Sequence, residues 1–305
     1  MNPFRRVLAA AGVLTVLAAG GCGLVSATAE PVATEGAGLD LTGAVTVDES
    51  LRALLPQSAR DRGFIRLVTD SSYAPMEYFA ADGRTIIGFE PDLAAALGAV
   101  LGIRLEMRFG DFASALDEVS KGTYDGVLSS MTDTADREKK VDFVNYFATG
   151  SSILVQRGNP KRITGMAGLC GYSVAAELGT VQEEMLRAGQ AKCGARPMTL
   201  VVGRTGADAV LQLRTGRATA LLLDFPPATA LVTDPLTNAY YELASSEQYR
   251  PGIYGIGVAK DNTALRDALR AALDRLIKTG TYGELLQRWS LTSGAVAEAT
   301  VNAGD

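Results

Sequence analysis

The residues best suited to chemistry lie in the stretch Ser129–Phe143, which reads SSMTDTADREKKVDF. Four hydroxyl side chains precede Arg137 there, and the pattern predicts a helix that begins beside this arginine with Thr134 as its cap. Hydroxyls, the free backbone N–H groups of a helix start and a guanidinium fork together bind a carboxylate without covalent chemistry. We therefore expect Arg137 to bind a carboxylate, the alternative being a surface salt bridge to Asp133 or Asp136.

Acidic and hydroxyl residues also stand where apolar segments end. Asp224 ends the run TALLLD, where a buried carboxylate is costly unless it pairs with a cation. Ser130 and Asp224 each stand eight residues after a glycine that closes a helical segment. Asp70 and Glu177 end the similar segments IRLVTD and YSVAAE. Because ligands of open α/β sheets bind outside the carboxyl ends of the strands, these four residues predict one site, unless the similarity of the short repeats is chance.

The elements that must position these residues alternate between strand and helix, which predicts an α/β fold. The predicted strands are Ile65–Thr69, Gly126–Ser129, Ser173–Ala176, Thr219–Leu223 and Gly255–Ala259. The clearest helix has Pro91 at its first position and stops at Gly102. Another follows Asn262 as its N-cap and ends before Gly280.

Composition limits the functions open to the chain. With 47% hydrophobic and 21% charged residues it can fill a sizeable core, and its formal net charge is −5. The acidic balance argues against a nucleic-acid partner, which requires a basic face. No histidine occurs in the sequence, which removes the commonest general base and metal ligand. We expect no cofactor, no metal and no catalytic residue.

Residues 1–21 have the pattern of an export signal. Arg5 and Arg6 precede a short apolar run, and small residues lead to Cys22. The run is too short to span a bilayer as a resident helix. The residues before Cys22 resemble a lipobox, with Ala19 where leucine is usual, so we expect Cys22 to carry lipid and anchor the protein to the outer face of the cytoplasmic membrane. The arginine pair leaves the twin-arginine and general secretory routes both open.

Two further cysteines, Cys170 and Cys193, remain once Cys22 carries lipid. In an exported protein they predict a disulfide, the alternative being two buried thiols. A metal site would need more ligands than two cysteines provide.

Three motifs together resemble the family 3 extracellular solute-binding proteins, the amino-acid receptors of ABC importers. They are TDSSYAPMEY (Thr69–Tyr78), GFEPDLAAALGAVLG (Gly88–Gly102) and the stretch Ser129–Phe143, in the order found in the family. The resemblance extends from about Gly63 to Leu291. It implies two lobes, each a mostly parallel sheet flanked by helices, joined by a hinge that the chain crosses twice, with a ligand cleft between them.

The same resemblance implies how the chain is divided. We expect a signal peptide (1–21), a lipid-anchored linker with a short helix (22–62), lobe 1 (63–154 plus 249–291), lobe 2 (155–248) and a disordered tail (292–305). The expected partners are a free amino acid as ligand, an ABC permease with its ATPase, and the membrane through the lipid anchor. We expect the protein to be a monomer.

Residues of lobe 1 that match the family's site fall in the three motifs. Arg137 is expected to grip the α-carboxylate in two bonds. Ser130 and Thr132 match contacts of the carboxylate and the ammonium, whereas strand alternation could turn Ser129 away. The aromatic residues Tyr73 and Phe112 match the pair that encloses the ligand side chain, and the alternative is that either packs in the core.

Residues of lobe 2 complete the expected site. Asp224 matches the acid that accepts the α-ammonium, the alternative being a helix cap. Thr180 begins a capping box with Glu183, and Thr180, Val181 and Gln182 match positions near the ligand backbone. Glu177 departs from the family, where an apolar or basic residue is common.

If Glu177 faces the cleft, Asp70, Glu177 and Asp224 oppose Arg137 alone. This charge balance predicts a ligand with a cationic side chain, such as lysine, arginine or ornithine. If Glu177 faces solvent, the argument is lost. The sequence thus indicates a substrate-binding lipoprotein of an ABC importer for a polar amino acid. The alternatives are a ligand-sensing co-receptor and a cleft enzyme of the cyclohexadienyl dehydratase type.

Overall fold

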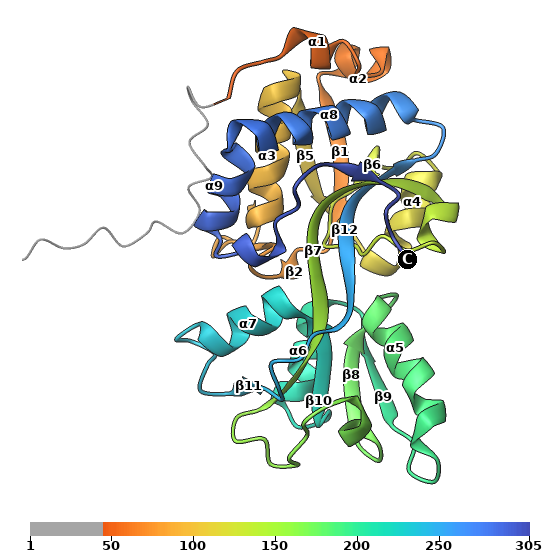
Figure 1. Cartoon of the computed structure of the whole chain (residues 1–305), viewed down its shortest axis with the longest axis vertical. Helices are drawn as coiled ribbons and strands as arrows, with labels where there is room; N and C mark the ends of the chain where they lie inside the picture. The colour runs from red at the N-terminus through yellow and green to blue at the C-terminus, as the bar shows by residue number, and fades with distance from the viewer. Residues whose placement is uncertain (1–44) are drawn as a thin grey trace, which may run out of the picture. The chain divides into compact units, whose positions relative to one another are not determined.

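We describe residues 45–305, as placed in a computed structural model (Figure 1). The export signal, Cys22 and most of the expected linker lie outside these residues. The strands are β1 (Phe64–Thr69), β2 (Ser72–Tyr73), β3 (Glu77–Phe79), β4 (Ile86–Ile87), β5 (Arg104–Phe109), β6 (Gly126–Val127), β7 (Val141–Gln156), β8 (Ser173–Glu177), β9 (Thr199–Gly203), β10 (Ala220–Asp224), β11 (Tyr241–Leu243), β12 (Tyr249–Ala259) and β13 (Thr300–Val301).

The helices are α1 (Glu49–Arg52), α2 (Gln57–Arg62), α3 (Phe89–Leu101), α4 (Ala115–Ser120), α5 (Val181–Gln190), α6 (Gly206–Arg214), α7 (Phe225–Thr233), α8 (Thr263–Thr279) and α9 (Thr281–Arg288). Short 3₁₀ turns occur at Phe112–Ser114, Arg137–Lys139, Met166–Leu169, Ala191–Cys193 and Thr292–Gly294. The α/β fold predicted from the sequence is confirmed.

Hydrogen bonds join the strands of both lobes in the order β5-β1-β6-β12-β7-β10-β8-β9. In lobe 1, β1 lies parallel between β5 and β6, and in lobe 2, β8 lies parallel between β10 and β9. β7 and β12 run antiparallel beside each other between these two parallel groups (Figure 1). The sheet is therefore mostly parallel within each lobe, as predicted.

Separate hydrophobic cores stabilise the two lobes. In lobe 1, α3, α8 and α9 bury their apolar faces with β1 and β12, around Phe89, Leu97 and Leu269. In lobe 2, one core lies between the sheet and α5, and another lies between the sheet and helices α6 and α7. The expected boundaries, 63–154 plus 249–291 and 155–248, stay a prediction that this grouping supports.

The chain passes between the lobes along β7 and β12. Tyr249 pairs with Ser151, and Gly252 pairs with Thr149. Both positions lie at or beside the segments expected to form the hinge. β12 begins six residues before the predicted Gly255, and no strand was predicted over β7. Because β7 is buried along most of its length, it lacks the alternation of apolar and polar residues by which a strand is recognised.

Helix ends follow the sequence signals closely. Gly102 and Gly280 end α3 and α8 in the left-handed conformation, and the Asn262 side chain accepts the backbone N–H of Leu265 at the start of α8. α3 begins at Phe89, so Pro91 is its third residue rather than its first. This is compatible with proline, because the N–H groups of a first turn have no partner within the helix.

The prediction of a disordered tail over 292–305 is wrong. β13 pairs with β7, and the backbone N–H of Asn302 donates to Phe143 O at 3.1 Å. The Asn302 side chain accepts the N–H of Phe143 at 2.8 Å, and Gly304 N donates to Asp133 Oδ2 at 3.1 Å. These pairings and the packing of Val296 and Ala299 against the core of lobe 1 hold the segment, and neither can be read from its composition.

The expected linker and disulfide have different outcomes. Residues 45–62 form α1, where a short helix was expected, and also α2, and Asp48 N donates to Val100 O at 2.9 Å, so this part of the chain packs on lobe 1. Cys170 and Cys193 form the predicted disulfide, with Cα atoms 5.3 Å apart. Within residues 45–305, no helix has the length and apolar character needed to cross a membrane.

Candidate ligand-binding site

Every residue that the sequence predicted to contact ligand lies on one cavity. Lobe 1 contributes Asp70, Tyr73, Phe112, Ser129, Ser130, Thr132 and Arg137, and lobe 2 contributes Glu177, Thr180, Val181, Gln182 and Asp224. Glu77 completes the lining. Glu177 and Asp224 are the last residues of β8 and β10, and Asp70 directly follows β1, so the site occupies the carboxyl edge of the sheets as expected.

Arg137 is buried at the lobe 1 side of this cavity, with 9% of its surface exposed. Its Nη1 donates to Thr132 O at 2.6 Å, and its Nη2 donates to Gly179 O of lobe 2 at 2.9 Å. These bonds use two of five N–H donors and fix the guanidinium, whose Cζ lies 5.6 Å from the centre of the Phe112 ring. Asp136 instead pairs with Lys139, so the surface salt bridge considered for Arg137 does not form.

The expected helix beside Arg137 is a single 3₁₀ turn, Arg137–Lys139. Thr134 accepts the N–H of Arg137 at 3.3 Å, as predicted for a cap. So short a turn aligns few peptide dipoles, so the helix expected to begin beside Arg137 adds little to carboxylate binding. The charge and the N–H groups of Arg137 itself must supply the attraction.

Asp224 lies on the opposite side of the cavity and contacts residues from both lobes. Its Oδ2 accepts the Tyr73 hydroxyl at 2.9 Å, and its Oδ1 accepts Gln182 Nε2 at 2.7 Å. The side chain makes no capping bond to α7, so the capping alternative is excluded. Burial raises the pKa of Asp224 to about 6, against the lowering effect of its hydrogen bonds and of Arg137. A cation that pairs with this carboxylate would relieve the cost of burying it.

Ser129 and Ser130 offer lone pairs rather than protons to the cavity. Ser129 Oγ accepts the N–H of Asp70 at 2.9 Å and donates to Glu77 Oε1 at 3.2 Å. Ser130 Oγ donates to Glu90 Oε1 at 2.9 Å. A hydroxyl has one proton, and in both serines it is directed at a glutamate. The two serines therefore suit an ammonium better than a carboxylate.

Behind these serines lies a buried pair of acids that the sequence reasoning missed. Glu77 and Glu90 are 1% and 0% exposed, and Tyr146 donates its hydroxyl to Glu90. Burial raises the pKa of both carboxyl groups, and the charge of Glu90 raises that of Glu77 further. Since two adjacent buried carboxylates repel each other, one proton shared between them is the stable arrangement.

The Glu90 carboxylate also fixes an unusual backbone. Ser130 has a φ of 47°, in the left-handed region that non-glycine residues rarely adopt, and its N–H donates to Glu90 Oε1 at 2.7 Å. Glu77 and Glu90 stand in the first two quoted motifs. Their contacts with Ser130 could not be predicted, because 40 or more residues separate them from it in the sequence.

Besides Asp224 and the Glu77–Glu90 pair, the cavity holds a third acidic group, formed by Asp70 and Glu177. Its position decides whether Glu177 faces the cleft or solvent. Glu177 is 7% exposed and points inward rather than to solvent. Both oxygens of Asp70 and Oε1 of Glu177 are buried, and the two carboxyl groups lie within hydrogen-bonding reach of each other, which requires a proton on one of them. Burial raises the pKa of both groups, and the neighbouring Asp70 raises that of Glu177 further.

The remaining site residues frame the cavity. Thr180 caps α5 by accepting Glu183 N at 3.2 Å, and Glu183 returns a bond to Gly179 N at 2.7 Å, one residue before the expected partner. Tyr73 is half-buried, whereas Phe112 is 8% exposed and also packs in the core of lobe 1. The structure thus brings together all the predicted residues, and their roles toward a ligand stay predictions.

These features define a two-lobed α/β protein with a polar cavity between its lobes. The model of the bacterial extracellular solute-binding proteins, family 3, matches residues 65–292. The chain belongs to this family.

Individual relatives agree with this assignment. The chain is 28% identical over 256 residues to the arginine-binding protein ArgT of Corynebacterium glutamicum, covering 83% of this chain and 82% of that protein. It resembles an ancestral arginine-binding protein solved with arginine, with a TM-score of 0.69 and 29% identity over 75% of this chain and 98% of that one. It also resembles an ancestral amino acid-binding protein, AncCDT-1, described as a precursor of cyclohexadienyl dehydratase, with a TM-score of 0.67 and 28% identity over 78% and 98%.

Proposed function

We propose that this protein is the amino-acid receptor of an ABC importer and that it binds a basic amino acid, with arginine as the leading candidate. The observation that carries the proposal is the placement of Arg137 and Asp224, from different lobes, on one cavity. A guanidinium and a carboxylate on opposite sides match the α-carboxylate and α-ammonium of an amino acid. The relatives named above support arginine.

Charge balance supports a cationic side chain. Four acids, Asp70, Glu77, Glu177 and Asp224, line the cavity together with Arg137 as the one base in its lining. After the α-groups pair with Arg137 and Asp224, and Glu77 shares a proton with Glu90, the adjacent carboxyl groups of Asp70 and Glu177 are left for the side chain. A guanidinium or ammonium there replaces costly carboxylate burial by charge-assisted hydrogen bonds, each worth about 1.5–3 kcal/mol.

Ligand capture by lobe closure fits the contacts across the cavity. Tyr73 of lobe 1 bonds to Asp224 of lobe 2, and Arg137 bonds to Gly179 across the same gap. Entry of an amino acid requires these bonds to break, and β7 and β12 are the two connections about which the lobes would turn.

We further propose export and anchoring. The signal pattern of residues 1–21 and the lipobox-like residues before Cys22 support a lipid-anchored protein at the outer face of the cytoplasmic membrane. In that position a permease and its ATPase would receive the ligand.

Binding rather than catalysis is proposed because the cavity matches both α-groups of a free amino acid. Glu177 is nevertheless a buried acid of raised pKa, as a general acid would be. Incubation with prephenate and arogenate tests the dehydratase alternative, and turnover of either compound would refute a purely binding role.

A thermal-shift screen of the twenty amino acids with ornithine and citrulline tests the main proposal. Ligand at 100 times its dissociation constant stabilises the folded state by about 2.7 kcal/mol. We expect arginine, lysine and ornithine to raise the melting temperature. Citrulline is the control, since it has nearly the shape of arginine without the charge. Equal shifts by citrulline and arginine would contradict the charge argument, and no shift with any amino acid would contradict the receptor function.

A further inference from the structure

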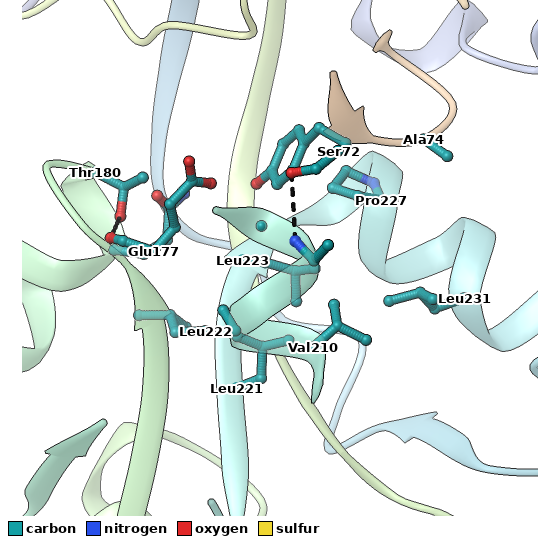
Figure 2. Close-up of a pocket in the computed structure, with 15 residues that line it drawn as sticks. Ser72, Ala74, Glu177, Thr180, Val210, Leu221, Leu222, Leu223, Pro227 and Leu231 are labelled. Carbon is teal, nitrogen blue, oxygen red and sulfur yellow. Dashed lines mark hydrogen bonds between the residues drawn. The ribbon is translucent and has the colours of Figure 1, made fainter. Parts of the chain in front are cut away.

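A second cavity, of about 250 Å³, adjoins the candidate site on the lobe 2 side (Figure 2). Its walls are mostly apolar and come from α6, β10 and α7, through Val210, Leu221, Leu223 and Leu231. Ser72 and Ala74 of lobe 1 lie at its rim, where Ser72 Oγ accepts the N–H of Ala207 at 3.3 Å, shown dashed in Figure 2. We call this space the apolar cavity.

The apolar cavity and the candidate site share part of their lining. Tyr73, Glu177, Thr180 and Gln182 line both spaces. Glu177 and Tyr73 meet at the start of α6, because a Cβ added to Gly206 would lie 2.9 Å from the Tyr73 ring and 3.4 Å from Glu177 Oε2. The Glu177 carboxylate therefore stands at the boundary, with the acidic site on one side and the apolar walls on the other.

The sequence of an acidic site, the Glu177 carboxyl group and apolar walls defines the kind of ligand that would fit both spaces. A cation is the group that best suits a ligand atom reaching Glu177, because it can replace the proton that the adjacent buried carboxyl groups of Asp70 and Glu177 share. Beyond the cation, the walls offer mostly apolar contacts and enough volume for several carbon atoms. An alkyl group on the distal nitrogen of a basic amino acid keeps the positive charge and adds the apolar surface that the walls match.

We propose, building on the proposed function, that the site accepts basic amino acids whose distal nitrogen carries an alkyl substituent, and that the substituent lies in the apolar cavity. Lysine alkylated on Nε and arginine alkylated on an ω-nitrogen belong to this class. Each buried methylene group is expected to tighten binding about fourfold. The unsubstituted amino acid fills the acidic site and leaves the apolar cavity to water.

Calorimetric titration with L-arginine and Nω-propyl-L-arginine tests the proposal, because both probes carry the same α-groups and the same charge. We expect the propyl compound to bind the wild-type protein at least tenfold more tightly than arginine. Val210→Trp fills the apolar cavity and is expected to remove this preference, with the dissociation constant of arginine changed less than threefold. Val232→Trp is the matched control, since Val232 is a half-buried valine of α7 that does not line the cavity.

The outcomes separate the two proposals. If the wild-type protein binds neither probe, arginine is overturned as the leading ligand, and this inference with it, whereas the receptor function is decided by the thermal-shift screen. If arginine binds and the propyl compound binds more weakly, or if Val210→Trp leaves the preference intact, the inference is overturned and the proposed function stands. Retained arginine binding shows that the variant is folded, and the smaller replacement Val210→Phe serves if Val210→Trp does not fold.

Discussion

Replacing Asp224 by asparagine should make the ligand-free protein more stable while weakening its site. Asp224 is 6% exposed, and burial raises its pKa from 3.8 to about 6. A rise of about two pKa units corresponds to about 3 kcal/mol of destabilisation at pH 8, at 1.36 kcal/mol per unit. Asparagine keeps an acceptor for Gln182 and removes the charge, although its amide nitrogen must donate to the Tyr73 hydroxyl instead of accepting from it, so the variant should gain up to about this amount in its free energy of unfolding.

The sign of the pH dependence distinguishes this cause from improved packing. A carboxyl group whose pKa is raised by folding favours the folded state fully below its unfolded pKa and loses that contribution as the pH rises through the folded value. The advantage of Asp224→Asn should therefore be up to about 3 kcal/mol at pH 8 and less than about 1 kcal/mol at pH 4.

Urea unfolding of ligand-free protein, followed by the fluorescence of the single tryptophan, measures this difference at both pH values. The same variant should bind arginine more weakly by about 2–4 kcal/mol in calorimetry, because the α-ammonium loses a charged partner. A variant no more stable than the wild type at pH 8, or one whose advantage is equal at pH 4, would refute the reasoning.

Three other substitutions have distinct expected outcomes. Glu177→Gln should weaken arginine and lysine at least tenfold and leave citrulline within threefold in calorimetry, and equal losses would remove the charge argument. Glu90→Gln can keep the bonds to Ser130 and Tyr146 without the second acid, so its unfolding free energy should fall less between pH 6 and pH 9 than that of the wild type; unchanged dependence would contradict a shared proton. Replacing both Cys170 and Cys193 by serine opens a loop of 23 residues and should lower unfolding stability by about 3 kcal/mol with arginine affinity unchanged, and a lost affinity would show that the disulfide shapes the site.

Local chemistry made much of the site predictable from the sequence. Asp224 and Glu177 end apolar strands, and an acid at such an end projects from the carboxyl edge of the sheet, where the second lobe also presents its residues. Gly122 and Gly216 show why the two halves echo each other, since both have left-handed backbones after a helix and lead into strands of the sheet.

Other parts of the site depend on contacts between distant segments, which no local pattern encodes. Glu77 and Glu90 lie more than 35 residues before the serines they hold, and each alone has the sequence of an ordinary surface acid. β7 lacks alternation because it is buried along most of its length, and the C-terminal segment is fixed by pairing with β7 and by packing of Val296 and Ala299 against the core of lobe 1. The cap at Thr134 marks where a helix could begin but not where it ends, so the sequence does not show that only a three-residue turn forms at Arg137.

The central claim is that Arg137 and Asp224 hold the two α-groups of one amino acid. Its most direct test removes the α-carboxylate from the ligand and the guanidinium of Arg137 from the protein, singly and together. Agmatine is arginine without its α-carboxylate, so calorimetric titration of the wild type and Arg137→Ala with both compounds isolates that contact. We expect the wild type to bind arginine at least 100-fold more tightly than agmatine. Arg137→Ala should bring the two affinities within about threefold, by weakening arginine alone. If Arg137→Ala weakens agmatine as much as arginine, or if arginine keeps its advantage, the guanidinium does not hold the carboxylate and the account is wrong.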